Sequence, residues 1–202
     1  QEGRKVEIFD ADIEASTLEQ TTERILQINP PIVGFSVFQR ALPSFQIIVE
    51  KLRARGYRGH ITCGGITPSL SYPHILECLG DKVDSVVLGE GEKTIQELSA
   101  RILAGQDWHT VDGIAFQHNQ NNRVINRPIE VVDLDALPFA TRDYLETCLE
   151  KTNYATIIGS RGCYGICTFC SNFAFESLRP GSHWRPRNPA LVVDEMQELY
   201  EQ

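Results

Sequence analysis

Short apolar segments alternate with segments of helical periodicity along the first half of the chain. The apolar segments, which we predict to be strands, are residues 5–9, 32–38, 61–63 and 85–88. The segments in which apolar residues recur every three or four positions, which we predict to be helices, are residues 17–27, 44–55, 72–79 and 92–103. Because successive strand–helix–strand units form right-handed crossovers, this order predicts an α/β fold with a parallel sheet and helices on both faces.

A different pattern follows this alternation. In residues 113–126, GIAFQ and RVIN flank a polar tip, which predicts a β-hairpin. Residues 127–150 contain two prolines, many acidic side chains and no sustained periodicity, so we place a linker there. The sequence therefore predicts two units, residues 1–126 and 151–202, on either side of that linker.

The charge balance limits the partners that the chain can bind by electrostatic attraction. Lys and Arg number 19 and Asp and Glu number 27, which gives a formal net charge of −8. An acidic protein is poorly suited to bind a nucleic-acid backbone or an anionic membrane surface. No apolar run approaches the roughly 20 residues of a membrane span, and the N-terminus lacks the order of a signal peptide. We therefore expect a cytoplasmic protein that acts on a small molecule.

Three of the six cysteines, Cys163, Cys167 and Cys170, fall within eight residues. They follow a predicted strand at residues 155–160 and precede a predicted helix whose first residues are Asn188 and Pro189. In a cytoplasmic chain, thiols clustered in this way are more typical of metal ligands than of disulfides. We therefore expect a metal site on this loop.

Three thiolates leave several interpretations of that site open. A structural zinc site needs a fourth ligand, and the nearest candidate, His183, lies 13 residues beyond Cys170. A 4Fe-4S cluster held by three cysteines instead keeps one iron open to a small molecule. A cluster of buried thiols without a metal is the third interpretation.

The string from Ser160 to Ser171, SRGCYGICTFCS, resembles the signature of the radical S-adenosylmethionine (radical SAM) superfamily. The resemblance implies that Cys163, Cys167 and Cys170 hold a 4Fe-4S cluster whose fourth iron is chelated by S-adenosylmethionine (SAM). It also implies that Phe169 lies near the adenine, although an ordinary packed aromatic is the alternative. One electron, from a donor such as flavodoxin or ferredoxin, would then cleave SAM to methionine and a 5′-deoxyadenosyl radical.

The first unit resembles the cobalamin-binding domain found in the cobalamin-dependent branch of the same superfamily. The residues that carry this resemblance follow three predicted strands and are Ser36-Val37-Phe38, Gly64-Gly65 and Gly89-Glu90-Gly91-Glu92. The resemblance implies a flavodoxin-like or Rossmann-like domain followed by the first strand–helix unit of a partial TIM-type barrel. The carboxyl ends of parallel strands form a ligand edge, where we expect Ser36, Phe38, Gly64, Gly65, Gly89, Glu90 and Gly91 to contact cobalamin. Taken singly, these motifs are a strand-end hydroxyl, a turn and a helix start.

Compared with that family, the chain lacks the usual first strand and first helix and ends after one strand–helix pair of the barrel. We therefore expect a segment of a longer polypeptide that does not cleave SAM by itself. The expected function of the parent protein is a cobalamin-dependent radical SAM methyltransferase. One alternative is a methylthiotransferase, which needs a second cluster and so requires Cys63, Cys78 and Cys148 to converge. The other is a non-catalytic module that binds cobalamin or a structural metal.

The remaining candidates are interpreted as structural. Four histidines follow no ligand spacing and are expected at the surface or at strand edges: His60, His74, His109 and His118. Three arginines near Trp184 are expected to be solvated, with contact to a SAM carboxylate or an anionic substrate as the alternative: Arg179, Arg185 and Arg187. We expect Trp108 to pack beneath the hairpin.

Overall fold

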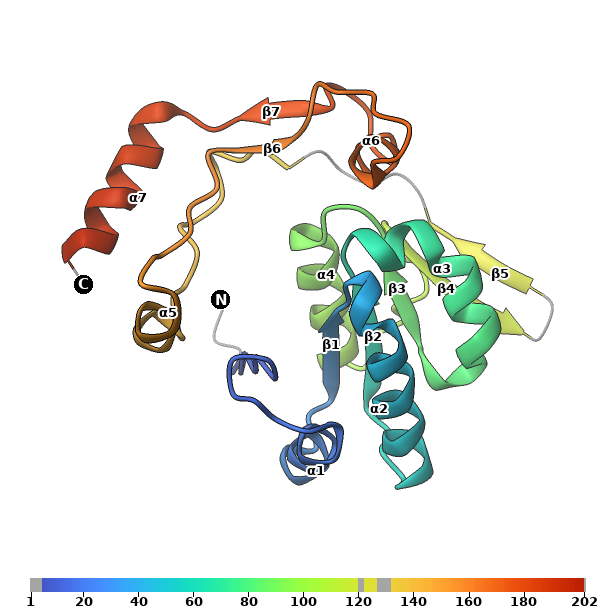
Figure 1. The fold of residues 1–202 in the computed structure, drawn as a ribbon. Coiled ribbons are helices and arrows are strands. Elements are labelled where there is room, and N and C mark those ends of the chain that lie inside the picture. Colours follow the sequence, from blue (N-terminus) through green and yellow to red (C-terminus); the bar gives the residue numbers. More distant parts are fainter. Residues whose placement is uncertain (1–4, 120–121, 127–131, 202) are drawn as a thin grey trace.

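The computed structural model describes residues 5–119, 122–126 and 132–201 (Figure 1). The first part, which we call the sheet lobe, contains α1 (Leu18–Ile28), β1 (Ile32–Ser36), α2 (Leu42–Ala54), β2 (His60–Gly64), α3 (Ile66–Leu79), β3 (Ser85–Val87), α4 (Glu92–Leu103), β4 (Ile114–Asn119) and β5 (Asn122–Ile125). The second part contains α5 (Leu145–Thr152), β6 (Ser160–Gly162), α6 (Ser171–Glu176), β7 (Trp184–Pro186) and α7 (Pro189–Glu201). We call residues 160–187 the cysteine segment.

The five strands of the sheet lobe are arranged in the order β1-β2-β3-β4-β5. The β1–β2 and β2–β3 pairs are parallel, whereas the β3–β4 and β4–β5 pairs are antiparallel. The predicted α/β class is therefore confirmed, with a sheet that is mixed because the predicted hairpin adds two antiparallel strands to its parallel half.

Helices cover both faces of this sheet, and neighbouring residues of β3 show the division. Val86 packs in a core with residues of α1, α2 and α3, whereas Val87 packs with Leu98 of α4 and with Ile114 and Phe116 of β4. Successive side chains of a strand point to opposite faces. The first core therefore lies under α1–α3 and the second under α4.

Local signals set the helix boundaries. The Thr17 side chain accepts from the Gln20 backbone and the Gln20 side chain accepts from the Thr17 backbone, which forms a capping box at the start of α1. At the other end, Asn29 has φ +47° in the left-handed region. The predicted helix at residues 72–79 proved too short, because α3 begins at Ile66 and Pro73 lies inside it without ending it.

The strand predicted at residues 5–9 is wrong. These residues form no ladder, and Val6 and Ile8 are exposed. Arg24 holds the segment instead, because its guanidinium lies 4.2 Å from the centre of the Phe9 ring and 2.9 Å from Glu7. An alternating segment becomes a strand only when a neighbour pairs with its backbone, and within the described residues β1 pairs only with β2.

The predicted hairpin is confirmed as β4 and β5, and residues 120–121 at its tip lie outside the described residues. Trp108 packs beneath it as expected, with its ring 5.4 Å from that of Phe116 and 4.7 Å from that of His60. His60 was expected at the surface or at a strand edge, and it is the first residue of β2, where it is buried because β2 lies between β1 and β3. His74, His109 and His118 are exposed, as predicted.

Within the predicted linker, residues 127–131 lie outside the described residues, and residues 132–144 form no helix or strand. Val132 and Leu134 are nevertheless buried, so this stretch packs against the protein. The helix α5 follows, and its neighbour Tyr144 donates to the Ile8 carbonyl over 3.3 Å. The boundaries of the two units stay a prediction.

In the cysteine segment, β6 and β7 form a two-stranded antiparallel ladder (Figure 1). The strand predicted at residues 155–160 is wrong in extent, because only Ser160 of that range is in β6. The helix predicted from Asn188 and Pro189 is confirmed as α7, where the Asn188 side chain accepts from the Ala190 backbone over 3.0 Å. None of the described helices is long and apolar enough to cross a bilayer.

Candidate functional site

The predicted ligand edge of the sheet lobe is assembled from the ends of β1, β2 and β3. Gly65 has φ +102°, and a side chain there would lie 3.8 Å from the Val37 carbonyl and 3.9 Å from the Ser36 hydroxyl. A side chain at Gly64 would contact Val87 at 3.4 Å. The motifs that follow β1 and β2 therefore lie against each other, and glycine lets their backbones approach.

Ser69 joins the second and third motifs, and the sequence analysis did not single it out. It is only 1% exposed, its hydroxyl donates to the Gly65 carbonyl over 2.7 Å, and it accepts from the Gly89 backbone over 2.9 Å. The usable signal was a serine four residues after a glycine at a helix start, where a hydroxyl reaches the carbonyl one turn back.

The same edge carries an exposed aromatic ring and a second pair of glycines. Phe38 follows β1 and is 73% exposed. Gly89 has φ +72°, and a side chain at Gly91 would lie 3.2 Å from Val87. At this edge the glycines leave the backbone uncovered by side chains, and one apolar ring is exposed. This combination suits a large ligand with an apolar face.

Glu90 occupies a different environment from its glycine neighbours. Its side chain is 5% exposed and forms ion pairs with Arg185 and, over 3.4 Å, with Arg161. Both arginines approach from the cysteine segment and contact the same carboxylate oxygen, whereas the other oxygen is buried without a hydrogen-bond partner among the described residues. The expected contact of Glu90 with cobalamin stays a prediction.

The expectation of solvated arginines is wrong for all three residues. Each is buried or nearly so and pairs with a buried glutamate: Arg179 with Glu176, Arg185 with Glu90, and Arg187 with Glu195. A charged side chain is buried only when it is paired. The sequence analysis could not see these partners, because two of the three pairs join different elements.

The three clustered cysteines lie on one loop between β6 and α6. The loop is closed by the Cys163 backbone, which donates to the His183 carbonyl over 2.9 Å. The Gly165 backbone lies 3.3 Å from the Cys163 sulfur, and a side chain at Gly165 would lie 3.4 Å from that sulfur and 3.7 Å from the Cys167 sulfur. Cys170 immediately precedes α6, and its backbone donates to Cys167.

These thiols fit an iron–sulfur cluster better than the alternatives. All three are free, and Cys167 and Cys170 are exposed, which excludes a set of buried thiols. The His183 ring lies 4.7 Å from that of Phe173, with Nε2 3.4 Å from Ser177, so its contacts lie at α6 and do not support a zinc site closed by His183. In the described part of the chain no three ligand side chains already converge, although two sulfurs flank Gly165.

Large apolar side chains of this loop are exposed. Phe169 is 92% exposed, and Tyr164 and Ile166 are also largely uncovered. The described residues therefore do not pack against Phe169, and its place near the adenine stays a prediction. An exposed ring beside the three clustered thiols is available to stack on a ligand.

The other cysteines do not form a second site. Cys63 lies in the core of the sheet lobe, where burial raises the pKa of its thiol to about 12. Cys78 is exposed on α3 with its sulfur 3.6 Å from the His74 ring, and Cys148 lies on α5. These positions do not support the second cluster of a methylthiotransferase.

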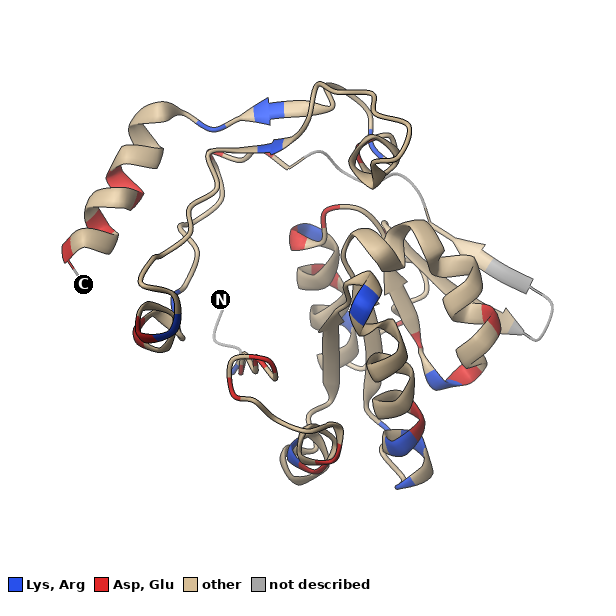
Figure 2. Cartoon of the chain, viewed as in Figure 1, with Lys and Arg blue, Asp and Glu red and all other residues tan. Residues whose placement is uncertain are grey.

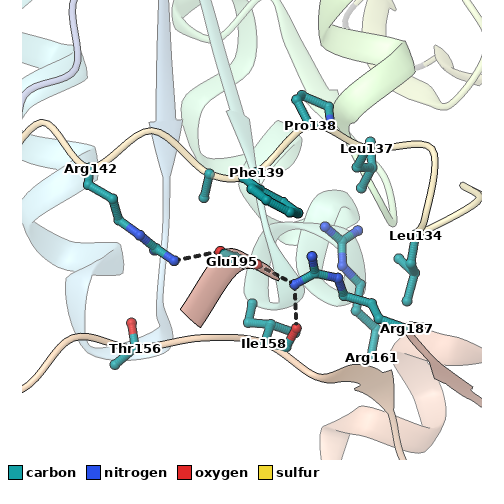
Figure 3. A pocket seen from close by; sticks show the side chains of 11 residues that line it. Leu134, Leu137, Pro138, Phe139, Arg142, Thr156, Ile158, Arg161, Arg187 and Glu195 are labelled. Atoms are coloured by element: carbon teal, nitrogen blue, oxygen red, sulfur yellow. Dashed lines mark hydrogen bonds and ion pairs between the residues drawn. The ribbon is translucent and has the colours of Figure 1, made fainter. Parts of the chain in front are cut away.

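Figure 3 shows a cavity of about 150 Å³ between the linker, the segment before β6 and α7. Arg142 from the linker and Arg187 after β7 point toward Glu195 of α7, at 2.7 and 2.6 Å (Figure 3). Arg187 also donates to the Ile158 carbonyl over 2.9 Å. Because both carboxylate oxygens of Glu195 are used, this cluster fastens the linker and the segment before β6 to α7.

Comparisons with known proteins identify the family model and the relatives to which this chain is similar. Residues 1–99 match the family model described as B12 binding domain. Over 98% of its length the chain is 27% identical to an uncharacterized methyltransferase of Pyrococcus horikoshii, and over 98% it is 28% identical to an anaerobic magnesium-protoporphyrin IX monomethyl ester cyclase of Synechocystis. The chain spans 43% and 40% of the length of these two relatives.

Among solved structures, the chain is similar to the cobalamin-dependent S-adenosylmethionine radical enzyme OxsB with aqua-cobalamin and SAM bound. The TM-score is 0.75 at 25% identity, over 98% of this chain and 27% of the other. The similarity therefore extends over both the sheet lobe and the cysteine segment, beyond the residues that the family model matches.

Proposed function

Because this chain belongs to the radical SAM proteins that carry a B12-binding domain, we propose that the whole protein is a cobalamin-dependent radical SAM methyltransferase acting on a small molecule. The observation that carries the proposal is the attachment of the cysteine loop to the glycine-lined edge of the sheet lobe through Glu90. Two sites meant for two cofactors of one reaction have to be held close together.

Each site has residues of the appropriate chemistry. The thiolates of Cys163, Cys167 and Cys170 would hold iron, and the Gly165 N–H near the Cys163 sulfur would stabilise its negative charge. Phe169 would stack against the adenine of SAM. When bound, the cluster and SAM supply a 5′-deoxyadenosyl radical and methylcobalamin supplies a methyl group.

At the edge of the sheet lobe, backbone would make most of the contacts with cobalamin. Ser36, Gly64, Gly65, Gly89 and Gly91 leave room for a corrin or its nucleotide tail. Phe38 would cover an apolar face of that ligand and exclude water from it. Electrons would come from a one-electron carrier such as flavodoxin or ferredoxin.

The proposal is tested by purifying the whole protein anaerobically and measuring iron, sulfide, the corrinoid absorption spectrum and 5′-deoxyadenosine formation. Alanine at Cys163, Cys167 or Cys170 is expected to remove iron and leave the corrinoid bound. Phe38→Ala is expected to weaken cobalamin binding and leave iron bound, and Cys78→Ala is the control that changes neither. Zinc in place of iron, or a protein that retains no corrinoid, would contradict the proposal.

A second candidate function is ring formation, because a cyclase is as similar to this chain as the methyltransferase is. The two reactions differ in the fate of the methyl group. SAM labelled in its methyl carbon leaves label in the product of a methyltransferase and none in the product of a cyclase.

A further inference from the structure

We propose that Glu90 is a positioning residue that holds the cysteine loop in place against the ligand edge of the sheet lobe. The inference concerns how the two parts are joined, and its purpose rests on the proposed function. Glu90 follows β3 and immediately precedes Gly91 and the first turn of α4. Figure 2 shows acidic residues where α4 begins and basic residues on β6 and β7.

The two arginines that contact Glu90 occupy facing positions in the ladder of the cysteine segment. Arg161 of β6 is paired in register with Arg185 of β7. Like charges directly opposite each other on two strands are destabilising. The ladder therefore needs a counter-charge from outside, and Glu90 supplies it to both arginines. Glu92 adds a second carboxylate, 2.6 Å from Arg161.

These same arginines flank the hydrogen bond that closes the cysteine loop. Arg161 lies two residues before Cys163, and Arg185 lies two residues after His183, whose carbonyl accepts from the Cys163 backbone. Any movement of the ladder away from Glu90 therefore displaces both ends of the loop. Arg185 also donates to the Val132 carbonyl over 2.7 Å, which ties the linker to the same point.

Burial distinguishes this contact from an ordinary surface ion pair. The side chains of Glu90 and Arg185 are 5% and 14% exposed, whereas those of the Glu97–Arg101 pair on α4 are 47% and 30% exposed. Exposed pairs contribute little, but removing one partner of a buried pair leaves an unpaired buried charge. Glu90→Gln leaves two facing guanidiniums with less counter-charge, and Glu97→Gln on α4, the helix that follows Glu90, is the matched control.

The first test is hydrogen exchange on the whole protein without cofactors. Glu90→Gln is expected to speed exchange of the amides of residues 160–170 and 184–185 by about tenfold or more, and to leave α2 unchanged. Glu97→Gln is expected to change neither region. Equal acceleration in α2 and in the loop would show a general loss of stability and overturn the proposal, as would no change at all.

A double-mutant cycle measures the coupling between Glu90 and Arg185 separately from the effect of each residue alone. If Glu90 and Arg185 act as one unit, Glu90→Gln combined with Arg185→Gln accelerates exchange less than the product of the two single effects. Effects that simply multiply would overturn the assignment of Glu90 to this arginine.

The loaded protein gives a spectroscopic readout that a purely structural role would not move. Pulsed EPR of cob(II)alamin and the reduced cluster measures the distance between them. The distance distribution is expected to be narrow in the unmodified protein and in Glu97→Gln, and broad in Glu90→Gln. An equally narrow distribution in Glu90→Gln would overturn the proposal. If the protein binds neither cofactor, the proposed function fails, and the exchange experiment still decides the role of Glu90.

Discussion

The sheet lobe and the cysteine segment are held together in opposite ways. In the sheet lobe, apolar side chains such as Leu52, Ile61 and Val86 are fully buried between the sheet and its helices. In the cysteine segment, Tyr164, Ile166 and Phe169 are exposed, and the order comes from backbone hydrogen bonds and buried ion pairs. The comparison teaches that the cysteine loop has no core of its own and takes its position from the lobe.

This difference predicts which changes each region tolerates. A region stabilised by apolar burial loses stability when a buried side chain is truncated. A region stabilised by backbone contacts is sensitive instead to any side chain added where two backbones meet. The predictions below test this division, in order of decreasing expected effect.

Gly162→Ala should have the largest effect. Gly162 has φ +78°, and a Cβ there would lie 1.9 Å from the His183 carbonyl that closes the cysteine loop. We expect the variant to retain less than about a tenth of the iron of the unmodified protein after anaerobic reconstitution, because the strained loop cannot present its thiols. Gly159→Ala is the control, since nothing lies within 4 Å of its added Cβ. Normal iron content in Gly162→Ala would mean that the loop closes in another way.

Leu98→Ala should destabilise the sheet lobe by about 2–5 kcal/mol, because Leu98 of α4 is fully buried against the sheet. Chemical denaturation followed by circular dichroism measures this change. Ile95→Ala on the same helix removes a partly exposed side chain and should cost less than about 1 kcal/mol. If the two variants were equally unstable, the second core would not be where the structure places it.

The stability of the sheet lobe should fall as the pH is lowered from about 7 to about 4. The pKa of His60 is lowered from 6.5 to about 4, mainly by burial; Asp84 opposes this shift, and Arg53 and His109 contribute to it. In that pH range the unfolded chain binds a proton that the folded chain does not, which costs about 3 kcal/mol by pH 4. Urea unfolding should show a smaller pH dependence for His60→Gln than for the exposed control His118→Gln. Equal slopes would mean that His60 titrates normally.

Ser69→Ala should have the smallest effect, a loss of about 1–3 kcal/mol, because it leaves the Gly89 N–H without its hydroxyl acceptor. We also expect weaker cobalamin binding, measured by titration of the corrinoid spectrum. Ser99→Ala, which removes an exposed hydroxyl that donates within α4, should change neither quantity. Cobalamin affinity unchanged in Ser69→Ala would show that the second and third motifs do not need this bridge.

Features that depend only on neighbouring residues in the sequence could be predicted. The capping residues Thr17 and Asn188 and the glycines after β2 and β3 mark their elements locally. The spacing of Cys163, Cys167 and Cys170 identified the loop in the same way, since ligands on one loop need no tertiary information.

Features that depend on distant partners could not be predicted. The alternating pattern at residues 5–9 says nothing about whether a neighbouring strand exists. Arg185 pairs with Glu90, which lies 95 residues earlier in the sequence. Rules that use only neighbouring residues therefore cannot predict that Arg185 is buried. The spacing of Ser69 from Gly65 indicates only its bond to the Gly65 carbonyl, whereas its contact with Gly89 depends on the fold and could not be predicted.

The chain has two tryptophans, and each region contains one of them. Trp108 packs among rings of the sheet lobe, whereas Trp184 of β7 is 41% exposed and lies beside Tyr164 on the cysteine loop. Replacing either tryptophan by phenylalanine therefore leaves an intrinsic fluorophore that reports on a single region. Quenching of the remaining tryptophan fluorescence would measure the rate of iron binding at one region, separately from any rearrangement in the other.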